Sequence, residues 1–135
     1  MNGPVIMSGN VMGLPRSGFF GMHFHEHPSP YGGTCQTVGD HFNPTNMLHG
    51  GQTSYIRHVG DMGNIVAQGL PGNGVAHIAK SDFLISLDPY APNSIIGKSL
   101  VIHINHDDLG RGINHESKQS GNSGTKIACG NVKFG

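Results

Sequence analysis

The sequence predicts an all-β protein, an antiparallel β-sandwich or barrel, on three observations. Segments with strand character are short and bounded by glycine or other turn residues. No segment keeps a helical period over three turns. Glycine accounts for 22 of the 135 residues, which implies many turns and loops. Short strands separated by turns are typical of antiparallel sandwiches and barrels, in which alternate residues face the core.

The expected strands follow one another along the chain. They are PVIMSG (4–9), GFFGMHFH (18–25), GNIVAQ (63–68), VAHIAK (75–80), FLISL (83–87), SLVIHI (99–104) and KIACGNVKF (126–134). Two long polar stretches, Glu26 to Gly63 and Asn105 to Gly124, interrupt this pattern. Loops of this length without secondary structure are usually functional or disordered, so we expect a ligand to order them.

Length and charge bound the class of protein. With 135 residues we expect a single domain over 1–135. Eight Lys and Arg balance eight Asp and Glu, which argues against a nucleic-acid or membrane surface held by bulk charge. The chain has no apolar run of membrane length and no secretory signal at its start, so we expect a cytoplasmic location. Its 10 histidines exceed what a passive surface needs.

The first histidine group lies in the strand HFH. Residues two apart share one face of a strand, so His23 and His25 can converge on one point. An isolated pair of this kind is more often two solvent-facing histidines on an edge strand. His103, at the end of SLVIH, adds a third nitrogen ligand, and a nitrogen-rich site with an open position suits copper or zinc. His27 precedes Pro28 and is interpreted as a flanking residue.

The second group lies in the first long loop. Three imidazoles and one carboxylate make a complete tetrahedral set for a structural zinc: His41, His49, His58 and Asp61. The alternative is a polar loop that is merely rich in histidine. Three further histidines fit no pattern and are interpreted as surface residues: His77, His106 and His115.

The two cysteines, Cys35 and Cys129, lie far apart and form no CxxC pair, so neither a zinc ribbon nor a thioredoxin-type site is indicated. They form either a disulfide or two buried thiols. Composition alone favours the thiols.

Taken together, these motifs resemble the copper/zinc superoxide dismutase family. Six segments follow one another in the family's order from Gly3 to Gly130: HFHEH, GTCQTVGDHFNP, HGG, RHVGDMGN, SLVIHINHDDLGRG and SGNSGTKIACG. The resemblance implies a Greek-key, immunoglobulin-like barrel. It also implies an oxidoreductase that converts superoxide, a small anion, to dioxygen and hydrogen peroxide by copper redox cycling beside a structural zinc.

The resemblance also assigns the site residues. The implied copper ligands are His23, His25, His41 and His103, and the implied zinc ligands are His41, His49, His58 and Asp61. His41 would bridge both ions as an imidazolate and take up a proton in the reduced half-cycle. Asp107 would join His23 to His49 from behind. Cys35 and Cys129 would form the family's disulfide, against the compositional preference for thiols.

The chain departs from the family in the recess over the copper. Lys126 stands where the family carries an arginine, so charge is kept and the planar fork is lost. We expect His41 and Lys126 to be the catalytic residues and the activity to be reduced but real. Gln119 stands where many relatives carry a lysine, for which Lys118 would substitute.

A second departure concerns the strands. The family has two further strands before the glycine-proline pair that matches Gly3 and Pro4, so this chain would have about six of the family's eight strands. A compact variant, a partner chain that covers the gap, and a recorded sequence that starts too late all stay open. A homodimer therefore carries over only weakly.

Two other functions compete with the enzyme. A non-catalytic copper carrier on the same fold should not need all of His103, His41 and a positive residue at the copper, which this chain keeps. A zinc hydrolase needs an open zinc position and a general base. Glu26 is the only glutamate near the histidine pairs, and Asp61 closes the zinc set.

Overall fold

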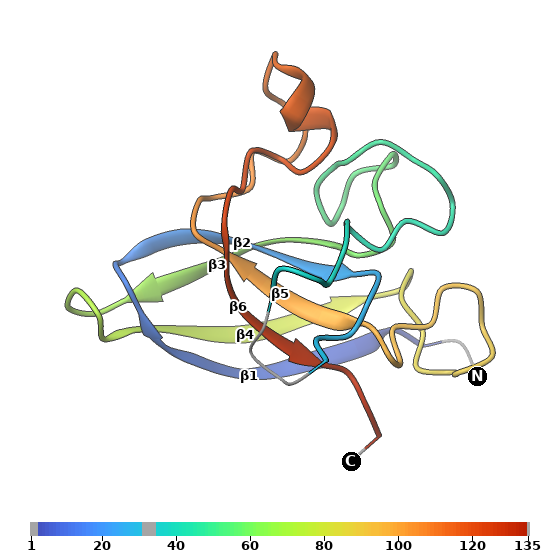
Figure 1. Ribbon diagram of the computed structural model, residues 1–135, viewed down its shortest axis with the longest axis horizontal. Helices are drawn as coiled ribbons and strands as arrows, with labels where there is room; N and C mark the ends of the chain where they lie inside the picture. The colour runs from blue at the N-terminus through green and yellow to red at the C-terminus, as the bar shows by residue number, and fades with distance from the viewer. Residues whose placement is uncertain (1–2, 31–34, 135) are drawn as a thin grey trace.

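The computed structural model describes residues 3–30 and 35–134. Six strands form one curled antiparallel sheet in the order β1-β4-β3-β2-β5-β6 (Figure 1). The strands are β1 (Val5–Leu14), β2 (Gly18–His25), β3 (Asp61–Gln68), β4 (Gly74–Asp82), β5 (Ser99–His103) and β6 (Lys126–Asn131). The 1-4-3-2 part of this order is a Greek key. The prediction of an all-β Greek-key fold with about six strands is therefore confirmed.

The core lies on the inner face of the sheet. Along β2, Phe20, Met22 and Phe24 are fully or almost fully buried and alternate with Gly21 and two histidines. They pack with Ile65 of β3 and Ile102 of β5. Burial of each large apolar side chain contributes about 1.5–3 kcal/mol. Apolar packing thus takes one face of β2 and leaves the histidine face free.

The strand expected at residues 83–87 is wrong. That segment bends, and its only pairing is an isolated bridge from Ser86 to Ser94. The carboxylate of Asp82 accepts hydrogen bonds from the backbone N–H groups of Leu84 and Ile85, which closes a turn at the end of β4. Phe83, Leu84 and Leu87 are exposed, and Ile85 is the only apolar residue of this run that is buried in the core.

The ends of two other strands also differ from expectation. β1 continues to Leu14, because it stays paired with β4 through Val11 and, beyond a register shift, at Leu14. β6 ends at Asn131 instead of residue 134.

β1 and β6 are the two edges of the sheet. An apolar groove of about 330 Å³ is lined by side chains that include Val11, Leu100 and Val132. The inner face is therefore incompletely covered between these edges.

The cysteines form a disulfide. Cys35 and Cys129 are 94 residues apart, and their Cα atoms lie 5.8 Å from each other. The bridge ties the first long loop to β6, so the expectation of free thiols is wrong and the pairing implied by the resemblance is confirmed.

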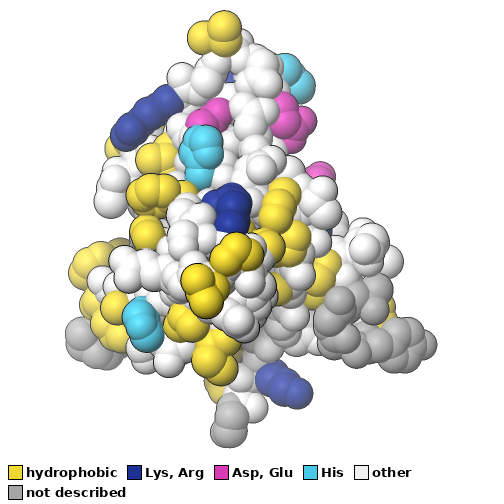
Figure 2. All heavy atoms as spheres, turned by 90° about the vertical axis from the view of Figure 1, so that its left-hand side faces the viewer, with side chains coloured by type: hydrophobic (Ala, Val, Ile, Leu, Met, Phe, Trp, Pro, Cys, Tyr) yellow, Lys and Arg dark blue, Asp and Glu magenta, His cyan; other side chains and the backbone are white. Residues whose placement is uncertain are grey.

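Both long loops project from the same end of the sheet (Figure 1). The second contains η1 (His115–Lys118), a single 3-10 turn that is the only helix of the described residues. No helix among residues 3–30 and 35–134 has the length and apolar character needed to span a bilayer. The β1–β2 and β3–β4 turns, which face the viewer in Figure 2, present several apolar side chains and few charged ones.

Candidate metal centre

His23 and His25 lie on the outer face of β2, where both long loops cover and bury them. The neighbouring strand β5 pairs Val101 with His23 and Ser99 with His25. His103, two residues beyond Val101, therefore points to the same side. Its Nε2 lies 3.1 Å from Nε2 of His25, and its ring centroid lies 4.8 Å from that of His23.

The first loop brings His41 onto this face. The backbone N–H of Phe42 donates to the carbonyl of Phe24, which holds the loop against the end of β2. The ring of His41 then stacks on that of His23, with centroids 3.9 Å apart. Its Nδ1 lies 2.9 Å from Oδ1 of Asp61 and 3.2 Å from Nδ1 of His58. Its Nε2 is buried and has no hydrogen-bond partner among the described residues.

The second histidine group, in the first long loop, surrounds Asp61, the first residue of β3. Oδ1 of Asp61 lies 3.2 Å from Nδ1 of His58, and Oδ2 lies 2.9 Å from Nδ1 of His49. The His49 contact is close but lies off a hydrogen-bonding direction, so His49 Nδ1 counts as unsatisfied.

The seven predicted ligands therefore meet in one place. Ligand atoms of His23, His25, His41 and His103 lie within 4.8 Å of one another, as do those of His23, His41, His49 and Asp61. His58 joins the second group through its contacts with His41 and Asp61. His27, His77, His106 and His115 are exposed and lie outside both groups.

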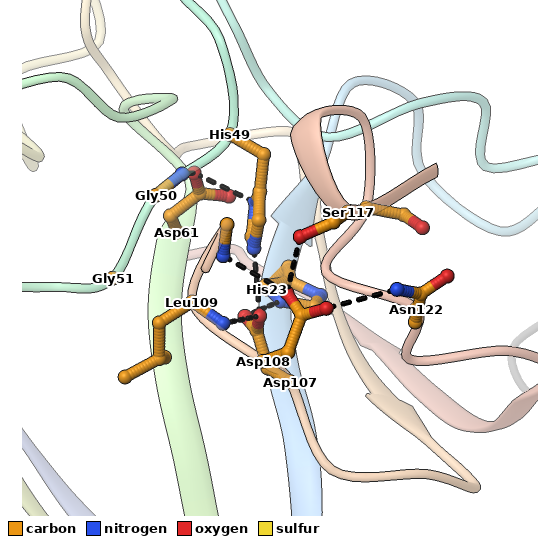
Figure 3. A network of polar contacts seen from close by, with 12 residues as sticks. His23, His49, Gly50, Gly51, Asp61, Asp107, Asp108, Leu109, Ser117 and Asn122 are labelled. Atoms are coloured by element: carbon orange, nitrogen blue, oxygen red, sulfur yellow. Dashed lines mark hydrogen bonds and ion pairs between the residues drawn. The ribbon is translucent and has the colours of Figure 1, made fainter. Parts of the chain in front are cut away.

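The ring nitrogens that face away from the cluster are held by other groups. Nδ1 of His25 bonds to the Gly39 carbonyl, and Nδ1 of His103 bonds to the Gly124 carbonyl. Nε2 of His23 and Nε2 of His49 each lie 2.7 Å from an oxygen of Asp107 (Figure 3). Because these oxygens accept a hydrogen bond from an outward N–H, the neutral form of each ring keeps a lone pair on its inward nitrogen for a metal ion.

Asp107 is itself rigidly placed. Its backbone exchanges two hydrogen bonds with the side-chain amide of Asn64. Its Oδ1 accepts a hydrogen bond from the backbone N–H of Leu109 (Figure 3). The backbone of Gly121 passes close behind the carboxylate of Asp107, with a φ of 73°. A Cβ there would overlap Oδ1 of Asp107 and crowd Nε2 of His49, so this position requires glycine.

Sequence reasoning missed the residues that hold the loops. The carboxylate of Asp108 accepts from Ser117 Oγ and Asn122 Nδ2, each at 2.8 Å, which fixes the second loop (Figure 3). Arg57, beside His58, forms a buried ion pair with Asp82 at 2.8 Å. The only signal in the sequence is that Asp108 directly follows Asp107 and that Arg57 directly precedes His58. This adjacency does not identify the residues with which Asp108 and Arg57 pair.

Burial controls the protonation of the first group. It lowers the pKa of His23 to about 3, with a further contribution from repulsion by His41. The same two causes lower the pKa of His25 to about 2. Burial, opposed by the hydrogen bond to the Gly124 carbonyl, lowers the pKa of His103 to about 4. These imidazoles are therefore neutral at neutral pH, as ligation requires.

The second group carries a fixed charge. Burial alone would raise the pKa of Asp61, but its close contacts with His41, His49 and His58 outweigh burial and hold the pKa well below its usual range. Burial likewise disfavours protonated His49, yet its contacts with Asp107 and Asp61 raise its pKa to about 9. Asp61 is thus an anion, and in the metal-free protein His49 is a positively charged imidazolium at neutral pH.

The donor sets fit copper and zinc. Three buried ring nitrogens, in His23, His41 and His49, have no hydrogen-bond partner within residues 3–30 and 35–134, although buried polar atoms normally have one. A metal ion would satisfy each of them. Four imidazoles suit copper, and three imidazoles with a carboxylate suit zinc.

A recess of about 590 Å³ opens over the first group. It is lined by His25, His41 and His103, and by Lys126, whose positive charge contributes to lowering the pKa of His103. Lys118 does not line it: the ammonium donates to the carbonyl of Gly110. The substitution of Lys118 for the steering lysine stays a prediction.

Comparison with known proteins agrees with this geometry. Residues 1–132 match the family described as copper/zinc superoxide dismutase. The chain is 46% identical to a superoxide dismutase [Cu-Zn] of Onchocerca volvulus, over 98% of this chain and 81% of the relative. It is 45% identical to a putative superoxide dismutase [Cu-Zn] of Autographa californica nuclear polyhedrosis virus, over 96% of this chain and 82% of the relative. It is 46% identical to an extracellular superoxide dismutase [Cu-Zn] of Brugia pahangi, over 93% of this chain and 61% of the relative.

Proposed function

The chain belongs to the copper/zinc superoxide dismutase family, and from this premise we propose which of its residues carry the dismutation of superoxide. Copper would be held by His23, His25, His41 and His103, and zinc by His41, His49, His58 and Asp61. The observation that carries the proposal is the ring of His41. Its Nδ1 faces Asp61 and His58, while its buried Nε2 has no partner and lies among the other histidines.

When bound, copper supplies the one-electron redox steps by which one superoxide becomes dioxygen and a second becomes hydrogen peroxide, while zinc has no redox change. His41 would handle a proton that the second step consumes. Because its Nδ1 is occupied on the Asp61 side, Nε2 is the atom that takes up and releases that proton. Asp107 would keep His23 and His49 in fixed orientations throughout.

Lys126 would bring the anion into the recess. Its side chain is half-buried at the wall, close enough for its charge to act on His103. An ammonium attracts superoxide but lacks the planar fork that would orient it. We therefore expect capture of the substrate with weaker positioning than an arginine would give.

The copper-carrier alternative is not favoured. A carrier needs a cluster that releases its ion and has no use for a cationic side chain in the recess over that cluster. Here the ligand groups are buried and held from behind by Asp107, Gly39 and Gly124.

The test combines metal content with superoxide consumption. The reconstituted protein should bind copper and zinc in near equal amounts and consume superoxide. His41→Ala should abolish consumption and weaken both sites, whereas His77→Ala, which changes an exposed histidine on β4, should change neither. Equal metal content with no consumption would instead support the carrier.

A cytoplasmic location, a homodimer and a single domain over residues 1–135 stay predictions. Two relatives carry the name extracellular superoxide dismutase, so location differs among similar proteins. Gel filtration with light scattering of the metal-loaded protein would decide its oligomeric state.

A further inference from the structure

A second apolar groove adjoins the one described between the edges β1 and β6. It has a volume of about 340 Å³, and its walls include Val5 and Met7 of β1 together with Ile78 of β4. Leu100 and Val132 belong to the walls of both grooves, so the two form one continuous channel, which we call the seam groove. Each part by itself reaches the volume typical of small-molecule sites, about 300–1,000 Å³.

The seam groove is the place where the core lacks a cover. Several partly buried apolar side chains pack against the core, and among the described residues all of them except Ile104 line this channel. Their outward surfaces are left to solvent by the part of the chain that the structure describes. A ligand that covered them would gain the free energy of apolar burial.

The channel is long. Its wall on β1 extends from Val5 to Val11, a distance of about 20 Å along a strand. At one end, the connection between β4 and β5 (residues 83–98, yellow in Figure 1) adds Leu87 and Ile95 to the wall. An apolar channel of this length matches an extended alkyl chain.

Lys80 adds a positive charge beside the channel. It pairs with Met7 across the β1–β4 ladder and follows Ile78 by two residues, so its side chain lies on the face that carries both groove residues. Its Nζ reaches over β3 and lies 4.0 Å from the point that a Cβ of Gly63 would occupy. The side chain is half-buried, and this burial lowers the pKa of Lys80.

The ammonium of Lys80 has no partner. Within residues 3–30 and 35–134, the only ion pair between a carboxylate and a lysine or arginine joins Asp82 to Arg57. Lys80 forms no side-chain hydrogen bond with any residue of these ranges either. Because a partly desolvated charge without a partner is costly, a carboxylate beside Lys80 would be favourable.

This charge selects among the possible occupants of the seam groove. The edge strands of a second copy, β1 (VIMSGNVMGL) and β6 (KIACGN), contain no carboxylate, so neither could neutralise Lys80 on entering the channel. An alkyl chain that ends in a carboxylate would both cover the apolar wall and pair with the ammonium.

We propose that the seam groove binds a free long-chain fatty acid, with its alkyl chain along the apolar wall between β1 and β6 and its carboxylate on Lys80. Binding is non-covalent and involves neither metal site. The inference therefore goes beyond the proposed dismutase function and does not depend on it.

The first test measures affinity against chain length. The metal-loaded, disulfide-bonded protein is titrated calorimetrically with octanoate, dodecanoate and hexadecanoate, each below its micelle concentration. Each additional buried CH₂ should raise the affinity roughly fourfold, until the alkyl chain exceeds the channel. The heat capacity change of binding should be negative, because apolar surface is buried. Ala128→Leu, which narrows the channel from β6, should make the affinity level off at a shorter acid.

The second test isolates the charge. Lys80→Met keeps the length of the side chain and should lower the affinity for dodecanoate about tenfold, while the affinity for the neutral dodecanol should stay unchanged. Arg111→Met is the matched control, because Arg111 is exposed in the second long loop and its replacement changes the net charge equally. In the ligand-free protein, Lys80→Met should also raise the urea midpoint, because it removes an ammonium without a partner.

Equal affinity of the wild-type protein for dodecanoate and dodecanol, an equal loss of dodecanoate affinity in Arg111→Met, or a lower urea midpoint in Lys80→Met would each overturn the inference. Absence of dodecanoate binding would overturn it too, and a dimer in light scattering would then assign the seam groove to a second copy. None of these measurements uses superoxide, so failure here and failure of the proposed function are distinguishable.

Discussion

Asp82 and Arg57 form the buried ion pair that connects the end of β4 to the loop carrying His58, and replacing Asp82 by alanine should strongly destabilise the protein. Both side chains are almost completely buried. The carboxylate receives Nη1 of Arg57 at 2.8 Å and the backbone N–H groups of Leu84 and Ile85 at 2.8 and 3.1 Å. Alanine removes all of these contacts at once.

The magnitude follows from the charge left behind. Removing one partner of a buried ion pair costs about 3–5 kcal/mol, because the other charge stays desolvated. Arg57 also donates to the carbonyls of His58 and Val59. A displaced guanidinium would therefore loosen the loop next to a predicted zinc ligand, and zinc affinity should fall by roughly 10- to 100-fold, as for other residues that support a ligand from behind.

Two assays measure these effects separately. Urea unfolding of the metal-free, disulfide-bonded protein, followed by circular dichroism, gives the free energy of unfolding, and competition with a chelator gives zinc affinity. Asp88→Ala is the control, because that exposed side chain should contribute within about 0.5 kcal/mol. The double variant Arg57→Met with Asp82→Leu should recover part of the loss, because no unpaired charge remains.

A loss below about 1 kcal/mol in Asp82→Ala, which is no more than an average point mutation costs, would refute the reasoning. The reasoning would also be refuted if the double variant lost more free energy of unfolding than the losses of its two single variants, Arg57→Met and Asp82→Leu, added together. Such a result would show that the charges do not compensate each other.

Four further predictions concern other parts of the molecule. Lys126→Arg should raise superoxide turnover at low salt, because a guanidinium orients the anion; no gain, or a loss, would contradict this. In the metal-free protein the pKa of His49 is raised from 6.5 to about 9, so its proton stabilises the fold fully below pH 6.5 and this contribution is lost as pH rises through about 9. Zinc uptake at neutral pH should therefore release a proton, and calorimetry in buffers of different ionisation enthalpy would detect it; no buffer dependence would exclude it. Reduction of the Cys35–Cys129 bridge should cost about 3 to 5 kcal/mol by loop entropy, and an unchanged urea midpoint would argue against that. Ser123→Ala should stabilise the fold by about 1 kcal/mol, because the buried hydroxyl has no hydrogen-bond partner in the part of the chain that the structure describes, whereas a lower melting temperature would show that it has one in solution.

The histidine strand shows how far alternation alone can reach. Apolar side chains at Phe20, Met22 and Phe24 occupy one face of β2, so the side chains between them must lie on the other. This local rule predicted that His23 and His25 converge, and it needs no knowledge of the rest of the chain. The strand predicted at 83–87 failed because the same kind of apolar run met a turn made by the carboxylate of Asp82.

The loops show where such rules end. The spacing of His41, His49 and His58 indicated zinc, but their joint position with the other histidines was implied only by a family resemblance. Lys118 looked suitable as a steering cation in the sequence, and the fold turns its ammonium toward Gly110.

The sequence by itself determined the fold class, the face of β2 that carries histidine, and the kinds of donor available for copper and zinc, because these depend on local periodicity and residue chemistry. Only the tertiary structure decided which groups act together. Asp107 meets His23 across 84 residues, and Arg57 meets Asp82 across 25. The lining of the recess also depends on which side chains two separate loops bring to one opening. Such pairings follow from the packing of distant segments, which no local pattern specifies.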